Sequence, residues 1–137
     1  MHMEMTLVKN EPKYWEYIRW VRNHPSTQSG WVTQSPDITG EQQKKYMAKH
    51  NDEYYICLAD NLHTCGYVGA VDGDIRVATD PTCRGKGIGS FMLNELMKLE
   101  PTAFAKIKID NKASIKLFEK CGFKRKFYIY TKEENDT

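Results

Sequence analysis

The spacing of apolar side chains changes period along this sequence, and each change predicts an element of secondary structure. Period-two stretches rich in Val, Ile and Tyr predict strands at residues 4–9, 53–59, 65–71, 74–79, 103–109 and 126–131. Apolar residues three and four apart predict helices at residues 12–24, 40–50, 88–100 and 111–123. The expected order is β-α-α-β-β-β-α-β-α-β, which is typical of a mixed α/β fold.

Residues at the ends of these elements agree with the pattern. Thr39 and Gln42 have the spacing of a capping box, which predicts the start of the second helix. Asn111 is a suitable N-cap for the fourth helix. The dipeptide Asp72-Gly73 predicts a tight hairpin, so the strands on either side of it should pair antiparallel.

Length and composition favour one domain, residues 1–137, of a soluble globular protein. The chain is 40% hydrophobic and 28% charged. No apolar run approaches the roughly 20 residues of a membrane span, and the N-terminus lacks the apolar centre of a signal peptide. We therefore expect a cytoplasmic protein with no membrane partner. The four cysteines and four histidines show no metal-ligand spacing, so we expect reduced thiols and no metal.

The formal net charge of +2 is too small to indicate a nucleic-acid partner, but its distribution is uneven. Residues 1–79 contain 8 Lys and Arg against 10 Asp and Glu, whereas residues 80–137 contain 12 against 8. An anionic ligand would therefore favour the second half of the chain. Part of this excess is alternating Lys, which is also typical of the solvated face of a strand.

The stretch TDPTCRGKGIGS, residues 79–90, has three glycines at alternate positions between a predicted strand and a predicted helix. Such a loop exposes backbone N–H groups beside the positive end of the helix dipole, so it predicts a phosphate site. The spacing matches neither a Walker loop nor a dinucleotide-binding fingerprint. The alternative is that the glycines only turn the chain tightly into the helix.

Two stretches resemble the signatures of the GNAT superfamily of acetyl-CoA-dependent N-acetyltransferases. RGKGIG, residues 84–89, is similar to the family's pyrophosphate loop, and DNKASIKLFEKCGFK, residues 110–124, is similar to its second signature. The resemblance covers about residues 55–124 and implies a central mixed sheet that splays near the coenzyme. It divides the chain into acceptor-side helices (1–53), a coenzyme-binding core (54–124), and a last strand with a polar tail (125–137).

The resemblance also implies which residues contact acetyl-CoA. The strand before the loop would pair edge-on with the pantetheine arm, as an added strand would. The loop N–H groups would bind the pyrophosphate, and the fourth helix would meet the coenzyme from the other side. The expected contacts are Val77, Ala78, Thr79, Arg84, Gly85, Lys86, Gly87, Ile88, Gly89, Ser90, Asn111, Ser114 and Phe118.

For catalysis, the resemblance implies direct attack of an amine on the thioester. Asp74 is the candidate base by position, although Asp72-Gly73-Asp74 also fits a plain turn. The second signature usually carries a tyrosine hydroxyl as the acid, but here Phe118 stands in its place. The proton for the thiolate would then come from another donor such as Tyr128 or Tyr130, from water, or from no group at all.

The acceptor is expected beside the N-terminal helices, at Arg19, Arg22 and Trp31, although a solvated helix face also explains the two arginines. The opening of the chain is similar to that of family members that acetylate amino sugars on nucleotides, so we expect a small-molecule amine. A peptide acetyltransferase and a non-catalytic acetyl-CoA sensor are the alternatives.

The region after residue 123 has room for one strand where the family usually has two. We therefore expect one wall of the acceptor site to be missing or to be supplied by a partner chain. The expected state is a monomer or a homodimer.

Overall fold

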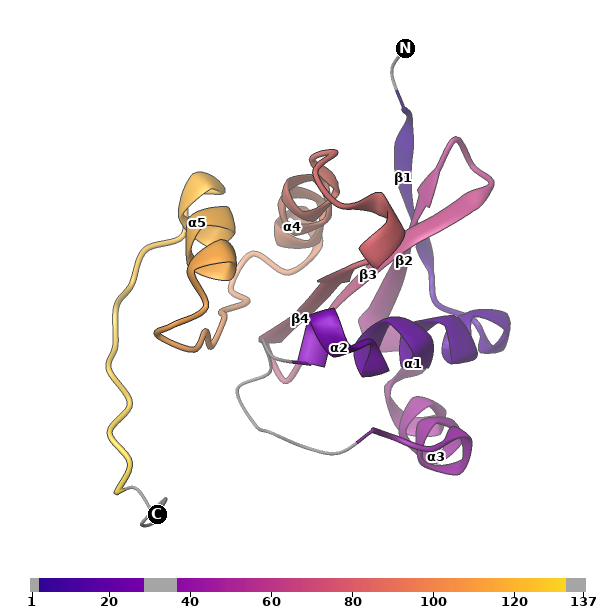
Figure 1. Ribbon diagram of the computed structural model, residues 1–137, viewed down its shortest axis with the longest axis horizontal. Helices are drawn as coiled ribbons and strands as arrows, with labels where there is room; N and C mark the ends of the chain where they lie inside the picture. Colours follow the sequence, from indigo (N-terminus) through magenta and orange to yellow (C-terminus); the bar gives the residue numbers. More distant parts are fainter. Residues whose placement is uncertain (1–2, 29–36, 133–137) are drawn as a thin grey trace.

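The computed structural model describes residues 3–28 and 37–132, in which helices cover both faces of a four-stranded sheet (Figure 1). The sheet is antiparallel throughout, in the order β1-β2-β3-β4. Its strands are β1 (Met5–Lys9), β2 (Tyr54–Ala59), β3 (His63–Val71) and β4 (Asp74–Thr79). The mixed α/β class predicted from the sequence is confirmed.

The hairpin between β3 and β4 turns at the predicted dipeptide. Asp72 has φ of 53° and Gly73 has φ of 81°, the left-handed pair that a two-residue turn between twisted strands requires. This turn sets the register, in which Val68 lies opposite Val77 and Tyr67 lies opposite Ala78.

The α-helices are α1 (Trp15–Asn23), α2 (Pro25–Gln28), α3 (Gly40–His50), α4 (Ile88–Leu99) and α5 (Lys112–Lys120). Short 3-10 turns are η1 (Pro12–Tyr14), η2 (Asn51–Glu53) and η3 (Pro81–Cys83). The capping box at α3 is confirmed, since Thr39 and Gln42 exchange side chain to backbone hydrogen bonds of 2.8 and 3.1 Å. Asn111 accepts a 3.1 Å bond from the Ser114 N–H, which confirms it as the N-cap of α5.

Each face of the sheet buries its own apolar cluster. One cluster joins the sheet to α4 and α5, with Val68, Ile88 and Leu93 fully or almost fully buried. The other joins the opposite face to α1 and α3, around Tyr67 and Met47. This division places the N-terminal helices and the C-terminal helices on opposite sides of β4, so a ligand at that edge can touch both.

The strand predicted at residues 103–109 is wrong, apart from one parallel bridge between Phe104 and Asp74. Two backbone hydrogen bonds hold the bridge, from the Ile75 N–H to the Phe104 carbonyl and from the Phe104 N–H to the Gly73 carbonyl, each 2.8 Å. Beyond it the segment separates from β4 because a cavity lies between them, lined by Ala105 and residues on both sides. A ladder cannot continue across a cavity.

The strand predicted at residues 126–131 is also wrong. This segment extends away from the body past α5 (Figure 1) and pairs with no described strand. Phe127 and Ile129 are 84% and 72% exposed. The alternating pattern is that of a strand, but a strand forms only where a neighbour satisfies its backbone groups.

Candidate active site

The glycine loop lies where β4 leads into α4. Gly85 and Gly87 have φ of 81° and 77°, a conformation that other L residues adopt only with strain. A Cβ at either position would meet no atom within 4 Å, so the space above the loop is open. Among the described residues, no backbone hydrogen bond is donated by an N–H from Arg84 to Gly87. These groups and the first turn of α4 form a cradle with positive potential, which fits a pyrophosphate.

Gly89 has a different role from the other two loop glycines. A Cβ there would lie 3.0 Å from Cδ2 of Leu117, so this glycine allows α4 and α5 to pack closely. The neighbouring Ile88 is 1% exposed and anchors the helix in the core. Of the three loop glycines, Gly85 and Gly87 therefore face open space where a ligand can bind, whereas Gly89 packs against α5.

The free edge of β4 continues from the loop. The Ile75 N–H points away from β3 toward Phe104, so by strand alternation the N–H groups of Val77 and Thr79 point the same way. From the Phe104 bridge to the end of β4 at Thr79, this edge has no partner strand among the described residues. It can therefore pair with an extended, amide-bearing chain. The Ala78 side chain is buried on the α1–α3 side.

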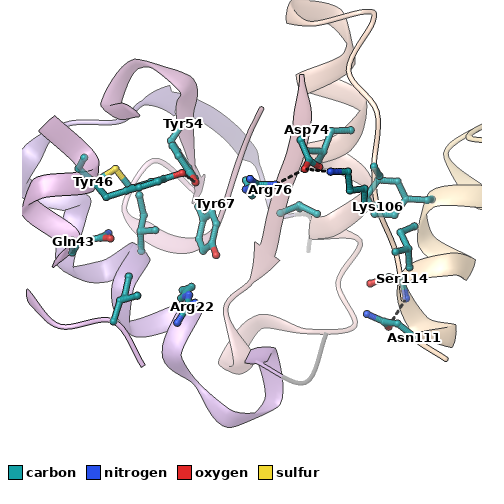
Figure 2. A pocket seen from close by; sticks show the side chains of 18 of the residues that line it. Arg22, Gln43, Tyr46, Tyr54, Tyr67, Asp74, Arg76, Lys106, Asn111 and Ser114 are labelled. Carbon is teal, nitrogen blue, oxygen red and sulfur yellow. Dashed lines mark hydrogen bonds and ion pairs between the residues drawn. The ribbon is translucent and has the colours of Figure 1, made fainter. Parts of the chain in front are cut away.

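A cavity of about 710 Å³ begins at this edge and reaches the N-terminal helices (Figure 2). Its coenzyme side is formed by Ile75, Val77, Ala105, Ile107, Asn111, Ser114 and Phe118. Its opposite side is formed by Ile18, Arg22, Ile38, Gln42, Gln43, Tyr46, Met47, Tyr54 and Tyr67. Asp74, Arg76 and Lys106 lie between the two sides.

Asp74 is the centre of a small ion-pair cluster. Its Oδ2 lies 3.0 Å from Nη1 of Arg76 and 3.7 Å from Nζ of Lys106. Burial is the largest single influence on the pKa of Arg76 and would lower it, but the hydrogen bond and charge of Asp74, together with Tyr54 and Tyr46, outweigh burial and raise the pKa. The carboxylate is thus held in a fixed position on the cavity wall.

Three tyrosines line the side nearer to α1 and α3. The hydroxyls of Tyr46 and Tyr54 are 2.7 Å apart, and Tyr67 packs beside Tyr54 with ring centroids 6.0 Å apart. Burial is the main cause that raises the pKa values of Tyr54 and Tyr67. Both groups therefore stay neutral; the Tyr54 hydroxyl bonds with that of Tyr46, and the Tyr67 hydroxyl can donate to a ligand.

The structure brings several of the predicted residues together and leaves others apart. Arg22, Asp74, Val77, Asn111, Ser114 and Phe118 line the cavity. Arg19 does not line it; its Nη2 lies 2.7 Å from Oε1 of Glu16 and its Nη1 donates to the Ile38 carbonyl. Tyr128 and Tyr130, 73% and 90% exposed, do not line it either, so a role for them stays a prediction. Trp31 lies outside the described residues.

Sequence reasoning missed Tyr46, Tyr54, Tyr67, Arg76 and Lys106. None of them belongs to a recognisable motif: Tyr54, Tyr67 and Arg76 lie in strands, Tyr46 lies in helix α3, and Lys106 lies in a segment whose alternating pattern resembles a solvated strand. The alternation of β4 could have identified Arg76, which lies two residues after the candidate base and so on the same face.

A family model agrees with this geometry, since the model described as Acetyltransferase (GNAT) family matches residues 9–123. The "Putative phosphinothricin acetyltransferase YwnH" of Bacillus subtilis (strain 168) is 42% identical over 55 residues, which cover 36% of this chain and 34% of that protein. The match thus spans 34% of that relative's length.

Solved structures share the fold. The spermidine N-acetyltransferase from Vibrio cholerae, in complex with CoA and spermine, has a TM-score of 0.80 at 17% identity, covering 91% of this chain and 83% of that one. The structure of yncA from Salmonella typhimurium, with its cofactor acetyl-CoA, has a TM-score of 0.72 at 20% identity, covering 88% and 79%.

Fold, loop and cavity fit the class of proteins that the matching family model describes, the acetyltransferases. The chain belongs to the acetyltransferase (GNAT) family. In the part of the chain that the structure describes, no helix is long and apolar enough to cross a membrane, and no cluster of His, Cys, Asp and Glu is arranged to hold a metal.

Proposed function

We propose that this protein transfers the acetyl group of acetyl-CoA to the primary amine of a small molecule that binds between β4, α1 and α3. The observation that carries the proposal is the continuous cavity, which joins the open edge of β4 to a polar chamber under the N-terminal helices. A donor on one side and an acceptor on the other can meet there without a covalent intermediate on the protein.

The residues have separate tasks. Backbone N–H groups of the loop from Arg84 to Gly87 and of the first turn of α4 hold the pyrophosphate, and the outward groups of Val77 and Thr79 orient the pantetheine arm. Phe118, 6% exposed, is an apolar wall that excludes water. Bound acetyl-CoA supplies the thioester that an amine can attack.

Asp74 is the one acidic side chain among the described cavity residues, so we assign it the proton from the acceptor amine. Its Oδ2 contacts Arg76 and Lys106, which fixes the carboxylate, and its other oxygen, Oδ1, would accept this proton. Phe118 has no hydroxyl that could donate a proton to the departing thiolate. Water or another donor would therefore protonate the thiolate.

Relatives guide the choice of acceptor. The names of those described above mention phosphinothricin and spermidine, and none mentions an amino sugar. Our proposal is therefore a small-molecule amine, without the sugar nucleotide that the N-terminal pattern had indicated.

Calorimetry with acetyl-CoA, followed by thiol release across a panel of small amines and peptides, tests the proposal. We expect micromolar binding and turnover with small amines. Binding without turnover on any amine would favour a sensor, and a preference for peptides would favour a peptide acetyltransferase.

Asp74→Asn should keep acetyl-CoA binding and lower kcat by about 10²–10⁴-fold. Asp72→Asn is the matched control, because Asp72 lies in the hairpin turn outside the cavity and asparagine tolerates its positive φ. If Asp74→Asn retains full turnover, the assignment of the base is wrong.

A further inference from the structure

The described lining of the cavity carries more positive than negative charge. Among the described lining residues, Arg22, Arg76 and Lys106 are basic and Asp74 is acidic. Asp74 already contacts two of these cations, at 3.0 and 3.7 Å. An acceptor with several positive charges would thus enter a cavity of its own sign, which disfavours both its approach and its binding.

Two arginines, Arg22 and Arg76, line the cavity near one buried tyrosine, and Nη1 of Arg22 donates a 3.1 Å hydrogen bond to Oδ1 of Asn23. Tyr67 lies between Arg22 of α1 and Arg76 of β4 (Figure 2), and both guanidinium groups oppose the rise that burial causes in the pKa of Tyr67. Tyr67 is 2% exposed and keeps its proton, so it adds an O–H donor between the two cations. Guanidinium and hydroxyl donors that line one cavity can bind a carboxylate or a phosphorus oxyanion.

The ion pair to Asp74 does not prevent Arg76 from binding a group in the cavity. A guanidinium has five N–H donors in a planar fork, and the contact to Asp74 is made through Nη1. Arg76 therefore positions the candidate base on one side and faces the chamber, which it lines, on the other.

We propose that the acceptor is an amine that also carries an acidic group, which Arg22 and Arg76 bind together with the Tyr67 hydroxyl while the amine is directed toward Asp74. This inference rests on the proposed function and narrows its substrate class to amino acids and their phosphorus analogues. A polyamine lacks the group that these donors would bind.

Matched acceptors test the proposal, each set sharing one side chain. L-methionine, its phosphonic acid analogue and 3-(methylthio)propylamine differ only in bearing a carboxylate, a phosphonate or no acid, and leucine and phenylalanine give equivalent sets. Thiol release at saturating acetyl-CoA should show kcat/KM at least tenfold higher with an acid-bearing member than with its plain amine and with spermidine.

The outcomes distinguish the acidic acceptor from the proposed acetyl transfer itself. Equal or better turnover of spermidine or of the plain amines would overturn the acidic acceptor and leave the proposed function standing. Bound acetyl-CoA with no thiol release from any amine would overturn both. The relative rates of carboxylate and phosphonate members identify which acid the site prefers.

Variants locate the acid-binding site. Arg22→Gln should raise KM at least tenfold for the acid-bearing acceptor while leaving KM for its plain amine and for acetyl-CoA within twofold. Arg22→Glu should reverse the preference toward spermidine. Lys45→Gln is the matched control, since it removes one positive charge from an exposed position of α3 outside the cavity.

Arg76→Lys should retain part of the acid preference that Arg76→Gln loses, because a lysine keeps the charge without the fork. Melting curves of each variant exclude unfolding. A KM that rises equally for acid and plain amine would overturn the assigned role of either arginine.

Discussion

Gly87 is the residue at which backbone conformation and ligand binding coincide. It is the N-cap of α4, with φ of 77° and open space where a Cβ would stand. Gly122, after α5, has the same two properties, with φ of 91°, but lies outside the loop between β4 and α4. Alanine substitutions at Gly87 and at Gly122 can therefore separate the effect of backbone strain from the effect of a lost binding surface.

We predict that Gly87→Ala and Gly122→Ala each lower the free energy of unfolding by about 1–2 kcal/mol, the cost of a left-handed conformation with a Cβ. Only Gly87→Ala should weaken CoA binding, by tenfold or more, because its methyl group would occupy the cradle. Chemical denaturation and calorimetry measure the two effects. Unchanged CoA affinity in a folded Gly87→Ala protein would remove the loop from the coenzyme site.

Phe118 is the residue at which this chain departs from the family pattern that it resembles. Its ring lines the cavity and packs edge-on against Phe123, with centroids 5.0 Å apart. The side chain is 6% exposed, so it works as packing on one side and as a wall on the other.

We predict that Phe118→Tyr changes kcat by less than about tenfold, because a positioned acid is worth about 10²–10⁴-fold only where proton transfer limits the rate. Phe118→Ala should lose acetyl-CoA affinity through lost packing, whereas Phe123→Ala should lose stability with a smaller effect on affinity. Steady-state kinetics and calorimetry provide the comparison. A hundredfold gain in kcat for Phe118→Tyr would show that thiolate protonation limits the natural protein.

At the scale of elements, one buried contact connects α1 to the start of the glycine loop. Tyr17 of α1 donates a 2.8 Å hydrogen bond to Oδ2 of Asp80, and Oδ1 of Asp80 accepts bonds from the N–H and hydroxyl of Thr82. Burial and this carboxylate raise the pKa of Tyr17, so the donor proton is retained. The helix that carries Arg22 is therefore tied to the segment that positions the loop.

We predict that Tyr17→Phe lowers the free energy of unfolding by about 1–3 kcal/mol, since it leaves an oxygen of the buried Asp80 without its partner. It should also raise KM for acetyl-CoA severalfold, because η3 loses a fixed neighbour. Tyr14→Phe, which removes a hydroxyl from the turn before α1, is the control. An equal loss in both variants would mean that the tie has no special effect on the loop.

Local chemistry explains why most elements were predictable. Thr39 with Gln42, Asn111, and Asp72-Gly73 act through neighbours in sequence, so their effects do not depend on the rest of the fold. Residues 103–109 and 126–131 have equally regular patterns, yet their strands depend on a distant partner. A pattern contains no information on whether that partner lies beside it.

The same distinction applies to the candidate site. Four of the predicted coenzyme contacts, Val77, Asn111, Ser114 and Phe118, line the cavity, because the first lies next to the glycine loop and the others share one continuous sequence pattern. The acceptor side was mostly missed, since it gathers single residues such as Tyr46, Tyr67 and Arg76 from three separate elements. Arg22 was predicted from its helix face, and only the fold separates it from Arg19, whose guanidinium pairs with Glu16.

At the scale of the whole molecule, the cavity joins two halves of the chain on opposite sides of β4 (Figure 2). Donor and acceptor can therefore be bound at the same time. Cys57 and Cys65 are fully buried, and no cysteine is among the described cavity residues, so the cavity offers no thiol to receive the acetyl group.

We predict sequential kinetics, in which a ternary complex precedes transfer. Double-reciprocal plots of initial rate against acetyl-CoA, at several concentrations of an accepted amine, should intersect, because both substrates must occupy the cavity before either product leaves. Ser114→Ala, which removes the one hydroxyl on the coenzyme side among the described lining residues, should leave this intersecting pattern and should not lower kcat more than about tenfold, since no base accompanies that hydroxyl. Parallel lines, or acetylated protein after incubation with acetyl-CoA alone, would show that the acetyl group passes through the chain, and direct attack by the amine would then be wrong.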